Sequence, residues 1–406
     1  AQALNAREDH DLGTARRLLG EIDPALRGFG WRLLAGLCRG DELDSFRLGE
    51  GPGAAPQCLA VLPGGERVAL ISADGRLHVR SLEGEEMSPP RRLPPHSQGG
   101  RFKGLTFSPN GRRFSYASGD VLQVLDVESF AILYEEISCQ PQLGWLDDDR
   151  LLYGFNGSVS PPPFPAAGAW ILKFRADNDI VRMPIPQMCA PLAVSQDRRF
   201  FVLHRVDIDP SSWRRSLHVF QSDGDLAQVP PPCYEMPGLE YPGKLVLSQT
   251  GRFLAMSVGT TLNRTARVLE LSSGRVLFDD EFRFPIHGLA IDPEERRLGV
   301  AGDDSVVRLY DFTRGRPEDP GTNTYDDEVA AARCQQVDPG GADAPPRDLL
   351  TRSAQDGRAQ FYLGHEKRVL DLAFGTSGEF MTVGGTIRRW PVGPARPAIR
   401  VGYQET

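Results

Sequence analysis

Lysine and the aromatic residues are scarce in this chain of 406 residues, which has four lysines and 8% aromatics. No run of the sequence approaches the ~18 apolar residues that a membrane-spanning helix needs, so we expect no direct membrane insertion. Glycine (43) and proline (33) are plentiful instead. This composition favours many short strands joined by turns over a helical bundle.

Catalytic sequence motifs are absent as well. There is no GxSxG, HExxH or Walker loop, no GxGxxG after a predicted strand, and no kinase catalytic loop. The seven histidines lack the spacing of a metal-ligand set, and none of the six cysteines forms a CxxC pair, which argues against a zinc site. The sequence therefore predicts a protein that is not an enzyme and uses no metal and no cofactor.

An acidic triplet, Asp147–Asp149, has two interpretations. A calcium loop needs alternating oxygen ligands in a shaped turn, and here Arg150 follows the triplet at once. The triplet therefore fits a turn between two strands better than a calcium site.

The formal net charge of −8 argues against a nucleic-acid partner, because such a partner requires a basic face. For the cysteines we expect buried free thiols. One disulfide stays open as an alternative among three cysteines near predicted repeat boundaries, namely Cys139, Cys189 and Cys233.

The clearest pattern is the stretch from Gly364 to Trp390. It opens with a Gly-His pair, alternates apolar and polar residues as half-buried strands do, and has glycine turns between its strands. The stretch resembles the repeat of the WD-repeat β-propeller family, which runs from Gly-His to Trp-Asp. Here Pro391 follows the Trp in place of the Asp.

Six earlier segments repeat the pattern of a strand, a turn and a second strand. The inner strands of repeats one to six follow one another at roughly 40–50 residues, which is WD-repeat spacing with modest insertions. The repeats begin at Cys58, Gly104, Leu143, Leu192, Leu245, Leu289 and Gly364.

The resemblance implies an all-β fold, a seven-bladed β-propeller of four-stranded antiparallel blades spanning residues 43–406. Residues 313–348, rich in Pro, Gly and Asp, are predicted to be an insertion in blade six. A degenerate eighth blade with residues 329–337 as its inner strand is the alternative. Further polar or proline-rich insertions should project from the ring at residues 156–168, 206–215, 230–242 and 259–264.

Residues 1–42 differ from the rest and show helical periodicity, with Asp23-Pro24 as a helix start and Gly40 as a stop. This part resembles the short helical region before the WD repeats of bacterial multidomain proteins, in which a Ser/Thr kinase domain often lies upstream. A tetratricopeptide-like helix pair is the alternative. We expect a small helical cap docked on the propeller, in a processed chain or a piece of a longer one.

Closure of the ring requires a strand borrowed from the other end of the chain, because an open sheet edge leaves backbone groups unpaired. Residues 44–48 are the favoured closing strand, and residues 398–401 are the alternative.

The resemblance also implies binding on the face where the inner strands start. Aligning the repeats places Gln57, Lys103 and His287 at one rim position, with Arg101 and Arg368 just before their strands. This basic mouth on an acidic protein would suit an acidic peptide or a phosphopeptide, because Arg pairs bidentately with carboxylate and phosphate. Ordinary solvated rim residues are the alternative.

His365 matches the family histidine that hydrogen-bonds to a Ser or Thr and to a turn Asp within its own blade. The turn Asp is missing here, and we expect His365 to be structural.

The sequence thus predicts a non-enzymatic protein–protein interaction scaffold that binds a protein or peptide partner. The alternatives are a sensor or regulatory domain of a bacterial Ser/Thr kinase, a structural subunit of a larger complex, and a propeller enzyme with a metal in its channel. The compartment, cytoplasmic or extracytoplasmic, stays open.

Overall fold

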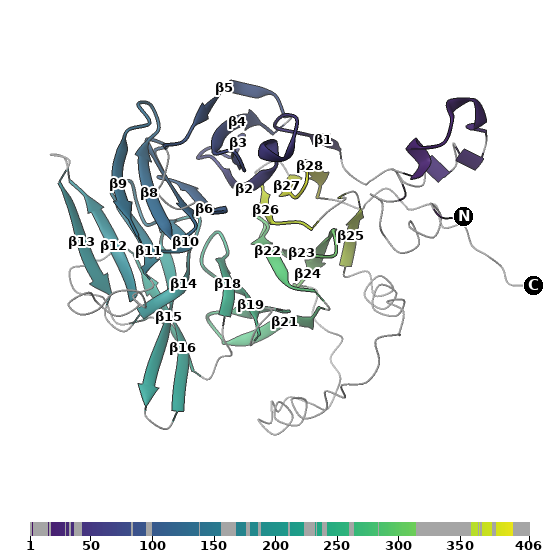
Figure 1. The fold of residues 1–406 in the computed structure, drawn as a ribbon. Helices are drawn as coiled ribbons and strands as arrows, with labels where there is room; N and C mark the ends of the chain where they lie inside the picture. The colour runs from purple at the N-terminus through teal and green to yellow at the C-terminus, as the bar shows by residue number, and fades with distance from the viewer. Residues whose placement is uncertain are drawn as a thin grey trace, which may run out of the picture.

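Seven antiparallel four-stranded sheets make up the described part of the chain and follow one another around a ring (Figure 1). The predicted fold, a seven-bladed β-propeller, is confirmed. The computed structural model describes residues 2, 15, 18–28, 30–31, 34–35, 43–82, 84–94, 100–137, 139–155, 168–175, 179–185, 188–209, 212–222, 232, 234–237, 242–259, 264–282, 284–313, 359–363, 365, 368–375 and 379–392.

The first four blades have these strands, from the first strand in sequence to the last. Blade one comprises β2 (Pro56–Val61), β3 (Arg67–Ser72), β4 (Arg76–Ser81) and β5 (Glu86–Arg92). Blade two comprises β6 (Phe102–Phe107), β7 (Arg113–Ser118), β8 (Val121–Asp126) and β9 (Ile132–Glu136). Blade three comprises β10 (Cys139–Trp145), β11 (Arg150–Phe155), β12 (Gly168–Phe174) and β13 (Ile180–Ile185). Blade four comprises β14 (Met188–Val194), β15 (Phe200–Asp209), β16 (Ser212–Gln221) and β17 (Tyr234–Pro237).

The remaining blades follow the same order. Blade five comprises β18 (Pro242–Leu247), β19 (Phe253–Val258), β20 (Thr265–Glu270) and β21 (Arg275–Glu281). Blade six comprises β22 (Ile286–Ile291), β23 (Arg297–Gly302), β24 (Val306–Asp311) and β25 (Ala359–Leu363). Blade seven comprises β26 (Asp371–Phe374), β27 (Glu379–Val383), β28 (Ile387–Pro391) and, from the other end of the chain, β1 (Asp44–Phe46).

Ring closure uses the N-terminal strand, as predicted. β1 pairs with β28, with Ser45 opposite Arg388 and Phe46 opposite Ile387. Phe46 also packs on the apolar cluster that blade seven shares with blade one, where Leu82 lies. The closing strand thus covers the β28 edge, which would otherwise expose unpaired backbone groups. The alternative closing strand, 398–401, lies outside the described residues.

The apolar cores lie between neighbouring blades. Between blades one and two, Phe102, Phe107, Phe114 and Tyr116 pack on residues of β3 and β4. Fully burying one such side chain stabilises the fold by roughly 1.5–3 kcal/mol. Each blade therefore depends on its neighbours, and the first strands contact one another in sequence around the ring, from β2 through to β26 and back to β2.

The first strands start with a local irregularity. In six of them, β2, β6, β10, β14, β18 and β22, the pairing register shifts within the first residues. Such bulges bend a strand and re-aim its side chains. They lie where each inner strand enters the ring, which is the face expected to bind a partner.

The predicted insertions have different outcomes. β24 pairs directly with β25, so residues 314–358 connect two neighbouring strands of blade six and lie outside the described residues, as does the eighth-blade strand at 329–337. Segment 206–215 belongs to the long β15–β16 hairpin, which extends away from the ring (Figure 1). Segments 156–168 and 259–264 lie mostly outside the described residues.

The prediction for 230–242 was partly wrong. Tyr234–Pro237 within it is β17, the outer strand of blade four, and pairs with β16. A proline ends this strand, and an edge strand tolerates proline because one side of its backbone needs no partner.

The N-terminal region is helical in short pieces, with the 3-10 helix η1 at Pro24–Leu26. Its apolar residues form a small cluster of their own, in which Trp31 Nε1 donates to the Leu19 carbonyl oxygen at 2.8 Å. Docking of this region on the propeller stays a prediction. In the described part of the chain, no helix has the length and apolar character to cross a membrane.

Candidate partner-binding site

All five predicted rim residues lie where inner strands begin. We call this region the channel mouth and define it by Gln57 (β2), Arg101 (just before β6), Lys103 (β6), His287 (β22) and Arg368 (just before β26). These residues come from blades six, seven, one and two, which are consecutive around the ring. The five residues therefore lie along one arc on one face of the ring.

Gln57 is engaged within the ring. Its Oε1 accepts a hydrogen bond from the backbone N–H of Phe102 at 2.7 Å, so the side chain joins the start of blade one to the start of blade two. His287 is engaged as well, because its Nε2 lies 2.8 Å from Asp303 Oδ1. These two side chains stabilise the mouth and contribute little free positive charge to it.

Arg101, Lys103 and Arg368 are the exposed cations of the mouth. Among the residues that the structure describes, no carboxylate lies within ion-pair distance of these three side chains. Lys103 lies directly before Gly104, whose φ of 63° falls in the left-handed region, and the register of β6 shifts after it. The glycine lets the strand turn at this point, and the bulge places Lys103 at the rim.

A charged pair at the mouth was not predicted from the sequence. Lys244 of blade five donates to Asp371 Oδ1 of blade seven at 2.7 Å, and its Nζ lies 3.4 Å from the His287 carbonyl oxygen of blade six. The pair therefore spans three blades. When the repeats are aligned, Lys244 and Asp371 both occupy the position after the rim residue, where blades two and six have glycine. The signal for this pair in the sequence was therefore two opposite charges at one aligned position, two blades apart.

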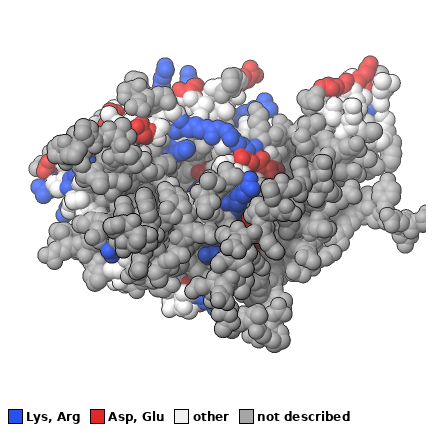
Figure 2. All heavy atoms as spheres, turned by 60° about the horizontal axis from the view of Figure 1, so that its bottom comes forward, with Lys and Arg blue, Asp and Glu red and all other residues white. Residues whose placement is uncertain are grey.

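Charged groups of both signs lie together on the described part of one face. Figure 2 shows one face on which Lys and Arg side chains lie next to Asp and Glu. Exposed pairs of this kind stabilise a fold by only about 0–1 kcal/mol. The three exposed cations of the mouth differ from these pairs, because no described carboxylate lies within ion-pair distance of them.

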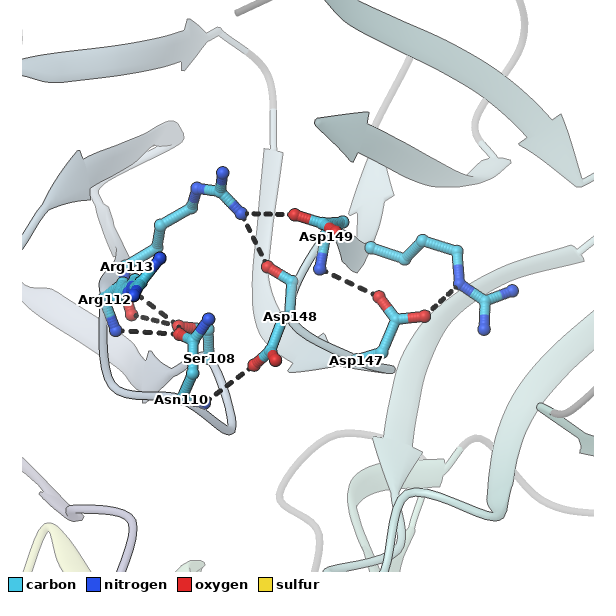
Figure 3. Close-up of polar contacts among 8 residues, drawn as sticks. Ser108, Asn110, Arg112, Arg113, Asp147, Asp148 and Asp149 are labelled. Atoms are coloured by element: carbon cyan, nitrogen blue, oxygen red, sulfur yellow. Dashed lines mark hydrogen bonds and ion pairs between the residues drawn. The ribbon is translucent and has the colours of Figure 1, made fainter. Parts of the chain in front are cut away.

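The acidic triplet Asp147–Asp149 forms the turn between β10 and β11, as predicted. Figure 3 shows Asp149 and the Asp148 carbonyl oxygen beside the Arg113 guanidinium, and Asp148 beside the Asn110 backbone N–H. Asp147 accepts from the Asp149 N–H and from Arg150 Nε. Each carboxylate therefore already has a partner, and the described residues contain no cluster suited to a metal ion.

The same turns link neighbouring blades on the face opposite the mouth. We call this series of contacts the turn belt. It joins blades two to six through four hydrogen bonds. Asn110 N donates to Asp148 Oδ1 (2.7 Å), Arg198 Nη1 to the Trp145 carbonyl oxygen (2.7 Å), Asp197 N to the Gln249 carbonyl oxygen (3.0 Å) and Thr250 N to Glu295 Oε1 (2.6 Å). The belt commits several turns of this face to structural contacts, which favours the mouth as the candidate for binding.

His365 is structural, as expected. Its Nε2 lies 2.6 Å from Thr382 Oγ1, and Trp390 Nε1 donates to the same oxygen at 2.7 Å. Burial, with the nearby Arg388 charge as a second cause, lowers the pKa of His365 to about 3. Gly384 and Gly385 stand at the neighbouring turn, and Nδ1 has no hydrogen-bond partner among the described residues. The histidine is therefore neutral and holds blade seven together through Thr382 and Trp390.

The cysteines that the structure describes are free. Cys58 and Cys139 are buried and carry no disulfide, and burial raises the pKa of both thiols. The alternative of a disulfide at Cys139 was therefore wrong. The side chains of Cys189 and Cys233 lie outside the described residues.

Comparison with known proteins finds similarity in structure and none in sequence. No protein-family model matches the chain, and no curated protein matches it. The chain is similar to the crystal structure of the Cps50 (Swd1) β-propeller domain of Myceliophteria thermophila, with a TM-score of 0.58 and 12% identity, over 87% of this chain and 100% of that chain. As many as 1515 solved chains show such similarity, so the fold is widely used. At this level of identity the likeness shows the fold alone, a β-propeller.

Proposed function

We propose that the chain is a non-enzymatic interaction module that binds an anionic segment of a protein partner at the channel mouth. The observation that supports this most is the trio Arg101, Lys103 and Arg368. These side chains are exposed and lack a carboxylate partner in the described part of the chain, whereas Lys244 and His287 beside them are paired. Cations left free in this way are available to a ligand.

The chemistry of the trio suits a carboxylate or a phosphate. A guanidinium can donate two parallel hydrogen bonds to either group, and a lysine adds a point charge. The inner strands fix the backbone positions from which these groups extend, and the three exposed side chains are ordered when the ligand binds. Association of the chain with a kinase domain, which the N-terminal resemblance implies, stays a prediction.

The test is charge reversal at the mouth, with the variant Arg101→Glu/Lys103→Glu. The probes are two fluorescent 12-residue peptides, one with a run of glutamates and one with phosphoserine, titrated by fluorescence anisotropy at two salt concentrations. We expect the wild-type chain to bind at least one peptide, more weakly at higher salt because exposed charges are screened. The double variant should bind at least about tenfold more weakly.

The matched control is Arg67→Glu/Arg112→Glu, which makes the same change of net charge at two exposed arginines near the turn belt. We expect this control to bind as the wild type does. Equal losses in both variants would show a general charge effect, and unchanged binding in the first variant would remove the mouth as the site.

A further inference from the structure

A pocket between blades one and two has no role in the channel mouth or the turn belt. It is an open depression of about 510 Å³, lined by Arg92, Leu93 and Pro94 at and just after the end of β5 and by Phe130 in the turn between β8 and β9. Leu93 is buried and forms an apolar part of its lining.

Phe130 has a backbone conformation that does not suit it. Its φ is 60°, in the left-handed region, where a bulky side chain is a genuine outlier. Blade five has the same turn with Gly274 at this position, at a φ of 68°. In both turns the residue donates to the carbonyl oxygen four residues earlier, Asp126 in blade two and Glu270 in blade five. Blade two therefore has a phenylalanine where the turn favours glycine.

The surroundings of Phe130 hold its ring in place. The ring packs on Phe114 at a centroid distance of 5.4 Å. The Arg91 guanidinium carbon lies 3.7 Å from the ring centroid, and Arg91 Nη1 donates to the Glu128 carbonyl oxygen at 2.8 Å. Strained backbone conformations that persist because surrounding contacts fix them are concentrated at binding sites. The ring is thus a preorganised aromatic wall of the pocket.

The charge beside the pocket indicates what it binds. Arg92 is exposed, and no carboxylate in the described part of the chain lies within ion-pair distance of it. Asp126, in the neighbouring turn, is occupied by the backbone N–H groups of Glu128 and Ser129. An apolar depression with a guanidinium at its edge complements an apolar group that has a negative charge next to it.

We propose that this pocket takes a large apolar side chain from an extended segment of a partner protein, and that a carboxylate beside that side chain pairs with Arg92. Interfaces concentrate their binding energy in aromatic and arginine residues around such pockets. The site is separate from the channel mouth, and a partner can use it whether or not it also binds there.

A displayed library of random 12-residue peptides, selected on the full chain, tests the proposal. We expect enrichment of peptides with Leu, Phe or Trp next to Asp or Glu, and anisotropy titrations of the enriched peptides then give Kd. Phe130→Gly removes the ring and relaxes the turn, and it should raise Kd at least about tenfold. Phe130→Asn, which tolerates the same φ, should do likewise, and Arg92→Glu should abolish the preference for acidic residues.

The control is Ile137→Ser, which removes another exposed apolar side chain (51% exposed) just after β9 and should leave Kd unchanged. Melting curves confirm that every variant is folded. The proposal is overturned if no such family of peptides is enriched, or if folded Phe130→Gly and Phe130→Asn bind the peptides as the wild type does. Peptides that depend on Arg101 and Lys103 but not on Phe130 would support the channel mouth and reject the pocket.

Discussion

His365 gives the stability of this propeller a defined pH dependence at the residue scale. Its pKa is about 3 in the folded chain, against an ordinary value of 6.5. Between these two values the unfolded chain binds a proton that the folded chain does not, so acidification from pH 7 removes stability. The loss approaches 1.36 kcal/mol per pH unit well below 6.5.

His365→Gln isolates this effect. The variant loses the contact with Thr382 and should be less stable than the wild type by about 1–3 kcal/mol at pH 7.5. The difference should shrink as the pH falls toward 5, because only the wild type has the histidine penalty. Denaturant titrations from pH 5 to 8 measure it. A difference that does not change with pH would mean that His365 is not held neutral.

The sequence shows the limits of residue-level prediction at the mouth. Arg101 and Lys103 could be placed by aligning repeats, because the strand starts recur. The pairing of Lys244 with Asp371, 127 residues apart, left only the weak signal of opposite charges at one aligned position, because it forms only once the ring brings blades five and seven together. Phe130 left a weak signal, since Asp126–Phe130 aligns with a turn that ends in Gly274.

At the element scale, β1 is predicted to stabilise the whole of blade seven. Deleting residues 1–47 removes β1 and exposes the β28 edge, and it removes Phe46 from its apolar cluster. The expected fall in melting temperature is about 3–6 °C, since a chain of this length loses roughly 1 °C per kcal/mol. Deleting residues 1–40 is the control, because it keeps β1. Equal melting temperatures for the two truncations would contradict the role of β1.

Elements were predictable where their signals are local. Alternating apolar residues between glycine turns placed β26, β27 and β28, and the chain does pair as those turns require. β17 was missed because the surrounding residues 230–242 are rich in proline, and only pairing with β16 makes Tyr234–Pro237 a strand. A strand that forms because of a partner elsewhere in the sheet is hard to recognise from its own sequence.

At the scale of the whole molecule, closure should make the seven blades unfold together. In an open repeat array each unit contacts only its neighbours, and the ends are free to unfold first. Here β2 contacts β26, β1 pairs with β28, and the turn belt joins blades two to six. No blade is at a free end of the ring, so a loss of stability in one blade lowers the stability of all seven.

Arg113→Ala tests whether a loss of stability in blade two, which does not contain the closing strand, spreads to the other blades. The variant removes the contacts of Arg113 with the Asp148 carbonyl and the Asp149 carboxylate, and should cost about 1–3 kcal/mol. Calorimetry should show one transition, moved by roughly 1–3 °C, and the truncation that removes β1 should move the same single transition. Arg252→Ala, which breaks an exposed pair within blade five, is the control and should cost less than about 1 kcal/mol. A second transition at lower temperature in either variant would mean that the blades unfold separately and that closure does not couple them.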